Sequence, residues 1–107
     1  MDYINVKLAL EYLSGNEVIF KKLKNTFLAN HCNYMEVYNR LIESCDINEA
    51  FNYVHSIKGI ALNLGAEKLN DICDVVLKEL KKESWRKDLI DEFFKTLRYS
   101  FFELTFL

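Results

Sequence analysis

The sequence lacks proline altogether and contains only three glycines in 107 residues. Sheet proteins need turn residues at roughly every 8 to 12 positions, and proline and glycine are the commonest of these. Half of the residues (50%) are hydrophobic, which is enough for one core in a chain of this length but hardly for two. We therefore expect a single all-helical domain over residues 1–107.

A charge excess of one sign is also absent. The chain has 14 basic and 16 acidic residues and a net charge of -2. Proteins that bind nucleic acid are usually basic over a face or along a helix, so we expect no nucleic-acid partner. No apolar run approaches the roughly 18 residues of a membrane helix, and the N-terminus lacks the basic and apolar segments of a secretory signal. We expect a cytoplasmic protein without a membrane partner.

Cysteine is scarce too, and its pattern indicates neither a disulfide framework nor a zinc site. Cys32, Cys45 and Cys73 are odd in number and form no Cys-x-x-Cys pair. They are typical of reduced thiols in a cytosol. His31 lies beside Cys32 without further ligands at workable spacing, so we expect a capping or surface role for it and no metal in this chain.

The apolar pattern that is present predicts a short N-terminal helix followed by longer ones, over residues 5–13, 16–44, 48–64, 66–82 and 84–106. The candidate caps are Asn5, Asn16, Asp46 and Asn48 at helix starts, and Gly65 at a helix end. An unbroken helix over 16–44 would be about 43 Å long, so we expect a bend or one-turn break near Asn30–Asn33.

Short connections between these helices force antiparallel neighbours. We therefore predict an up-down-up-down antiparallel four-helix bundle with the short N-terminal helix packed on it. The last helix is apolar nearly all round because it carries Phe102, Phe106 and Leu107. We expect these residues to be buried against the N-terminal helix rather than to mediate self-association, and we expect a monomer.

The segment from His55 to Gly65 places polar residues on a helix face that should be solvent. At about 100° per residue, Lys58 and Gly59 lie within roughly 60° of His55. The apolar residues take the opposite side, with Tyr53, Ile57, Ile60 and Leu64 about 180° away and Val54 and Ala61 flanking them. His55 should therefore point out of the core.

Gly59 costs the helix about 1 kcal/mol relative to alanine, which asks for a reason other than folding. Its missing side chain, one turn after His55, would let another protein approach the imidazole. The apolar residues Phe51, one turn before His55, and Leu62, two turns after it, fall on the same outward face. We predict that they form a docking patch around His55 together with Gly59 and Ala66.

At these residues the chain resembles the histidine-containing phosphotransfer (HPt) domain of multistep phosphorelays. That family's pattern, His-x-x-Lys-Gly followed six residues later by Gly, is met by His55, Lys58, Gly59 and Gly65. Further agreement is found at Ala66, Leu69 and Cys73, and upstream at Gly15-Asn16-Glu17 and Phe27. The resemblance spans roughly residues 3 to 105. One departure is Val54, where the family commonly has alanine.

The resemblance implies that His55 is a phosphoryl acceptor. Neutral imidazole is a good nucleophile near neutral pH, and the outer ring nitrogen, Nε2, is the expected attacking atom. The implied donors and acceptors are aspartates on receiver domains of response regulators or hybrid histidine kinases. Lys58 would stabilise charge, whereas the magnesium ion would belong to the receiver, so we expect no cofactor in this chain. The direction of transfer stays open.

The resemblance also implies a carrier rather than an enzyme. The chain has no glycine-rich nucleotide loop and only three glycines with which to build one, so we expect it to relay a phosphoryl group and not to phosphorylate itself. Lys81 and Lys82 are weak additional candidates near the phosphoryl group, because the helix dipole already explains basic residues in a last turn. Gly65 is given only a structural part, as a helix stop.

Two other function classes stay open from the residues alone. The first is a helical protein-interaction module without phosphotransfer, in which His55 or Lys58 would be expected to be missing. The second is an enzyme that uses His55 as a general base, which needs a concave pocket and an orienting carboxylate near the ring. An outward helix face is not expected to offer such a pocket.

Overall fold

The computed structural model describes residues 2–107, and every regular element in that range is helical. The elements are α1 (Val6–Tyr12), α2 (Glu17–His31), α3 (Tyr34–Ser44), α4 (Ile47–Ala61), the 3-10 turn η1 (Leu62–Leu64), α5 (Glu67–Lys81) and α6 (Lys87–Thr105). The prediction of an all-helical protein is confirmed, and the predicted helix bounds differ from the observed ones by a few residues.

Three of the predicted caps begin helices as expected. The side-chain oxygens of Asn5, Asn16 and Asp46 each accept a hydrogen bond of 3.0 Å from the backbone N–H three residues on. Such a cap stabilises a helix by about 1 kcal/mol, because it satisfies a donor that has no partner within the helix. The helix starts are therefore fixed by local chemistry.

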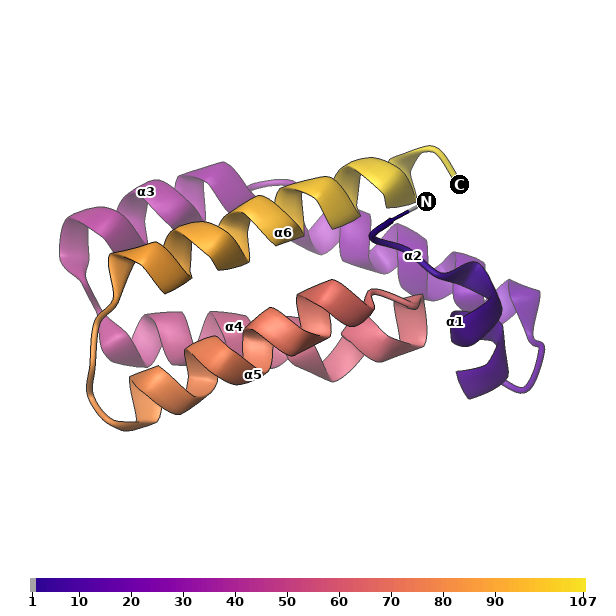
Figure 1. Ribbon diagram of the computed structural model, residues 1–107. Helices are drawn as coiled ribbons and strands as arrows, with labels where there is room; N and C mark the ends of the chain where they lie inside the picture. Colours follow the sequence, from indigo (N-terminus) through magenta and orange to yellow (C-terminus); the bar gives the residue numbers. More distant parts are fainter. Residues whose placement is uncertain (1) are drawn as a thin grey trace.

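The expected break in the long N-terminal helix is confirmed. Helix α2 ends at His31 and α3 begins at Tyr34, so that Cys32 and Asn33 form a turn between them. The two segments follow one another along the same side of the molecule, and both pack against α6 (Figure 1). We refer to these two consecutive helices together as the α2–α3 column.

His31 anchors the last turn of α2. Its ring lies 4.9 Å from the ring of Phe27 and 5.6 Å from that of Tyr53 on α4, measured between ring centroids. Burial lowers the pKa of His31 below 6.5 and raises the pKa of Tyr53 to about 12, because burial disfavours the charged form of each group. The role observed is packing of α2 on α4, which is neither of the roles expected from the sequence.

The remaining helices form consecutive antiparallel pairs. Helix α5 runs back along α4, and α6 runs back along α5 (Figure 1). The core lies between these helices and the α2–α3 column. Its largest fully buried side chains include Phe27, Leu41, Ile57, Leu69, Phe93 and Leu97. Each large apolar side chain removed from water contributes about 1.5–3 kcal/mol.

Gly65 joins the end of η1 to the N-terminal segment. Its φ of +73° is left-handed backbone, and its carbonyl accepts a 2.9 Å hydrogen bond from the N–H of Asn5. A Cβ atom on Gly65 would overlap the backbone carbonyl of Asn5. The N–H of Ala66 also closes back on the carbonyl of Ala61 at 2.9 Å. Gly65 is thus the C-cap residue of η1, which follows directly on α4, and close backbone contact is a second reason for glycine there.

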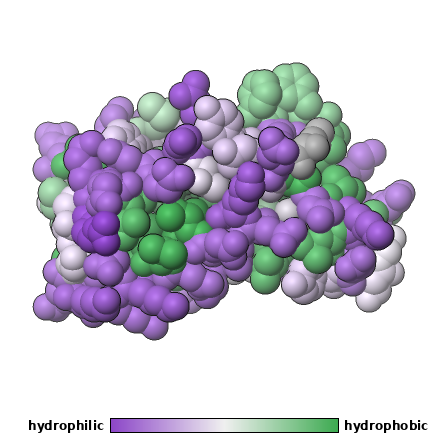
Figure 2. Space-filling view, in the orientation of Figure 1, coloured by the Kyte–Doolittle hydropathy of each residue, from purple (hydrophilic) through white to green (hydrophobic). Residues whose placement is uncertain are grey.

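The expected burial of the C-terminal aromatic residues is wrong. Phe102 is 61% exposed and Phe106 is 69% exposed, and their rings pack on each other with centroids 4.9 Å apart. Hydrophobic side chains gather over the C-terminal part of α6 (Figure 2). The N-terminal segment contacts α6 through other residues. The ring of Tyr3 stacks on that of Tyr99 with centroids 5.1 Å apart, and the carboxylate of Glu103 accepts hydrogen bonds of 3.1 Å from the N–H groups of Tyr3 and Ile4.

Each of the three cysteines is a free thiol. Cys32 and Cys45 are exposed, whereas Cys73 is buried on α5, where burial is the main cause that raises its pKa to about 12. Cys73 therefore behaves as a small core residue. Across residues 2–107, no helix combines the length and the apolar character that crossing a membrane requires.

The two glycines near the His55 segment should respond oppositely to alanine. Gly65→Ala should lower the free energy of unfolding by at least about 2 kcal/mol, because a left-handed φ and an overlap with Asn5 are both unfavourable. Gly59→Ala should leave stability equal or raise it by up to about 1 kcal/mol, because a Cβ there meets no atom within 4 Å. The free energies of unfolding of the two variants can be compared by urea unfolding monitored by circular dichroism. Equal stability of the two variants would contradict this account of Gly65.

Candidate functional site

His55 lies on the outward side of α4, as predicted. Val54, Ile57 and Ala61 on the same helix are fully buried, whereas His55 is exposed. Its ring stacks on Phe51 one turn earlier, with centroids 5.9 Å apart and planes inclined by 15°. Among residues 2–107, no hydrogen bond to either ring nitrogen is formed. The imidazole is thus supported by an aromatic neighbour and open to a reaction partner.

Gly59 leaves the surface next to His55 open. A Cβ atom built on Gly59 would meet nothing within 4 Å, so neither packing nor backbone conformation requires glycine here. The position is exposed and lies in the last turn of α4. The role of Gly59 in access to the imidazole stays a prediction.

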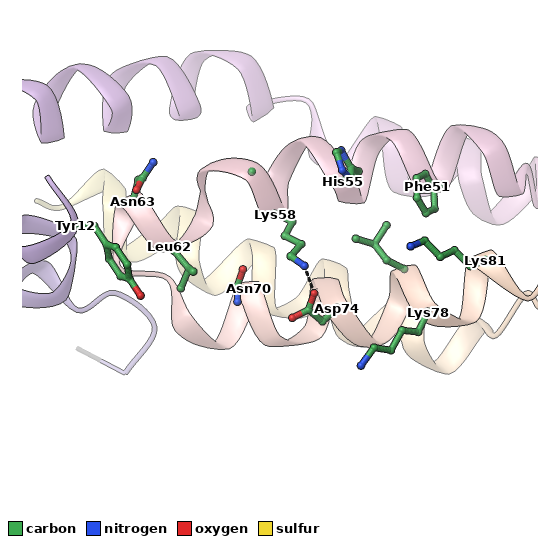
Figure 3. A pocket seen from close by; sticks show the side chains of 12 residues that line it. Tyr12, Phe51, His55, Lys58, Leu62, Asn63, Asn70, Asp74, Lys78 and Lys81 are labelled. Carbon is green, nitrogen blue, oxygen red and sulfur yellow. Dashed lines mark hydrogen bonds and ion pairs between the residues drawn. The ribbon is translucent and has the colours of Figure 1, made fainter.

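Lys58 leans away from α4 toward α5. Its Nζ atom forms an ion pair with Oδ1 of Asp74, and both side chains are about two-fifths exposed, at 39% and 41% (Figure 3). Sequence reasoning treated Lys58 as a free cation and missed Asp74. The sequence shows only that Asp74 belongs to the helix that follows α4 and runs back along it. It does not show which residue of α4 Asp74 faces, because the local sequence pattern does not determine how two helices are aligned.

His55, Lys58 and Gly59 line an open groove of about 590 Å³ between α4 and α5. The α4 side also presents Phe51, followed by Leu62 in η1; the α5 side presents Asn70, Asp74, Leu77, Lys78 and Lys81; and Tyr12 and Asn63 lie at one end (Figure 3). Phe51 and Leu62 are both half-buried, so each offers part of its apolar surface to the groove. The predicted apolar neighbours of His55 are therefore present in a shaped surface and not on a flat face.

Ala66 does not belong to this surface. It is 1% exposed and has the non-helical backbone of the residue that precedes α5. The expectation that Ala66 borders the docking patch rested on continuing the helix past Gly65, where the chain in fact turns. Its small side chain is part of the core beneath the connection between η1 and α5.

The groove is predominantly cationic. Its lining contains Lys58, Lys78 and Lys81 but one acidic side chain, Asp74. Within residues 2–107, neither Lys78 nor Lys81 forms a salt bridge. Lys81, a weak candidate from the sequence, does line the groove. Lys82 does not, and its Nζ atom lies 3.5 Å from Oε1 of Glu79. Such a surface attracts an anionic partner.

The family model for the Hpt domain matches residues 22–99 of the 107-residue chain. The chain therefore belongs to the Hpt domain family. The comparison with curated proteins and the comparison with solved structures gave no match. Hpt domains are phosphocarriers of phosphorelays that work with the receiver domains of response regulators, and this general role applies to the chain as a member of the family.

Proposed function

We propose that this chain is a phosphorelay intermediate in which His55 takes a phosphoryl group from an aspartyl phosphate of one receiver domain and passes it to an aspartate of another. The observation that carries the proposal is the position of His55, an exposed imidazole held on a rigid, well-packed helix beside an open groove. Rigid placement of the nucleophile matters because phosphoryl transfer depends chiefly on positioning and charge stabilisation.

The chemical step joins Nε2 of His55 to phosphorus. The lone pair of the neutral ring forms the N–P bond while the bond between phosphorus and the aspartyl oxygen breaks, and the aspartate leaves as a carboxylate. The reverse step returns the phosphoryl group to a receiver aspartate. Phe51 packs against one side of the ring, which restricts its rotation.

Lys58 supplies positive charge to this step. It lies three residues after His55, and residues at this spacing are neighbours on a helix surface, roughly 5–6 Å apart between Cβ atoms. A lysine side chain spans that distance easily. In the proposed mechanism the ammonium group neutralises part of the charge on the phosphoryl oxygens, while the magnesium ion held by the receiver domain neutralises another part.

The same groove is proposed as the docking surface for the receiver domain. Phe51 and Leu62 provide apolar contact, Gly59 allows close approach, and Lys78 and Lys81 provide a cationic rim. A phosphorylated acidic site on the partner complements this charge, which raises the rate of encounter and orients the partner.

We also propose that the helices form the up-down-up-down four-helix bundle expected from the sequence, with α2 and α3 as one interrupted member and α1 packed at one end. The alternating directions of α4, α5 and α6 support this topology (Figure 1). The exposed thiols of Cys32 and Cys45 fit a reducing cytoplasm, which is our proposal for where the chain acts.

Label transfer tests the assignment of His55. A receiver domain carrying radioactive aspartyl phosphate should pass label to the wild-type chain as an acid-labile, alkali-stable adduct, which is typical of phosphohistidine. His55→Gln should accept none. The chain has two histidines, so His31→Gln is the matched control and should still be labelled. Label that persists in His55→Gln would refute the assignment, and a wild-type chain that accepts none would favour an interaction module without phosphotransfer.

Bulk at position 59 tests the docking surface. Gly59→Glu should slow transfer at least about tenfold, because its side chain occupies the approach to His55 and adds negative charge beside the phosphoryl group. Gly59→Ala should slow it less. Asn39→Glu adds the same charge at an exposed position on α3 and should have no comparable effect. Stopped-flow kinetics measure the rate of phosphoryl transfer, and circular dichroism checks that each variant is folded. Unfolding of Gly59→Glu, or transfer by Gly59→Glu at the wild-type rate, would contradict the proposal.

A further inference from the structure

Asp74 holds a special position in the groove beside His55. It is the one acidic side chain among the residues that line the groove, and its carboxylate is paired with the ammonium group of Lys58. The pair links α4 to α5 across a separation of 16 residues in the chain. As long as this pair holds, the cation nearest to His55 along the helix is already neutralised.

From this pairing we infer that Asp74 is a positioning residue that competes with the phosphoryl group on His55 for Lys58. The inference rests on the proposed function of His55. In the unphosphorylated chain Asp74 holds Lys58 against α5. In the phosphorylated chain Lys58 exchanges partners and turns to the phosphoryl oxygens. Asp74 thereby sets how strongly the domain retains the group that it carries.

The exchange is physically inexpensive because both members of the pair reach solvent. Ion pairs between partly exposed side chains are weak, since water and salt screen them and ordering two side chains costs entropy. A phosphoryl group carries about 1.5 to 2 negative charges and three strong acceptor oxygens, whereas Asp74 carries one charge. The phosphoryl group is therefore the stronger partner, and Lys58 lies within reach of both.

A carrier benefits from this competition. A phosphoryl group that is held too tightly would not be returned to a receiver aspartate. The carboxylate of Asp74 weakens retention because it offers Lys58 an alternative partner. Lys78 and Lys81, which have no salt bridge within the described residues, supply charge for docking but do not need to be released first.

The transfer equilibrium tests this inference, because a purely structural role of Asp74 would alter rates in both directions without moving the equilibrium. A phosphorylated receiver domain that exchanges label with the wild-type chain is mixed with each variant until the distribution is constant. Asp74→Asn should shift the equilibrium toward phosphohistidine by about two- to fivefold, the effect expected for loss of a partly exposed charge pair. The asparagine of Asp74→Asn has a side chain of about the same size and still offers Lys58 an acceptor oxygen, so the substitution removes mainly the negative charge.

Two controls make the result specific. Asp71→Asn removes the same charge from an exposed position on α5 that does not line the groove, and it should shift the equilibrium much less. In a Lys58→Ala background, Asp74→Asn should lose most of its effect on the equilibrium, because the ammonium group for which Asp74 and the phosphoryl group compete is no longer present. Circular dichroism checks that every variant is folded.

The outcomes separate this inference from the proposed function. A wild-type chain that exchanges label, combined with no shift for Asp74→Asn, would refute the inference alone. An equal shift in the Lys58→Ala background would also refute it, because Asp74 would then act by direct repulsion and not through Lys58. A wild-type chain that takes no label from any receiver domain would refute the proposed function, and this inference with it.

Discussion

The packing of one side of α4 against the core is the constraint on which the rest of the site depends. Val54, Ile57 and Ala61 are fully buried, and this fixes the rotation of the helix about its axis. Because a helix repeats every 3.6 residues, burying these positions directs His55 and Gly59 to solvent and Lys58 to the boundary with α5. The buried apolar residues of α4 thus determine the direction of the His55 side chain without contacting its ring.

A second constraint fixes where the chain turns after α4 and η1. Gly65 adopts a left-handed conformation that lets the chain turn into α5, and its carbonyl binds the N–H of Asn5. The turn brings α5 back along α4, and only then does Asp74 meet Lys58. The groove is therefore a product of two helices whose relative placement depends on one tight connection. The motif residues contribute to it in different ways: His55 through exposure, Gly59 through missing bulk and Gly65 through backbone conformation.

Features governed by local chemistry were predictable from the sequence. The caps at Asn5, Asn16 and Asp46 and the break after His31 follow from short-range signals, and so does the outward direction of His55. Features that depend on how helices pair were not. Asp74 was missed because the register of α5 on α4 is set by packing. Ala66 was misplaced because a helical projection fails beyond Gly65, and Phe102 and Phe106 because apolar side chains are common on protein surfaces as well as in cores.

The central claim is that Nε2 of His55 carries the phosphoryl group, and it is tested most directly by nuclear magnetic resonance. The chain is labelled with ¹⁵N in its two histidines, phosphorylated by a receiver domain and examined for coupling between ³¹P and ring nitrogens. The account predicts coupling to Nε2 of His55, with the ring of His31 unchanged. Coupling to a nitrogen of His31, or phosphorylated protein with no coupled ring nitrogen, would contradict it.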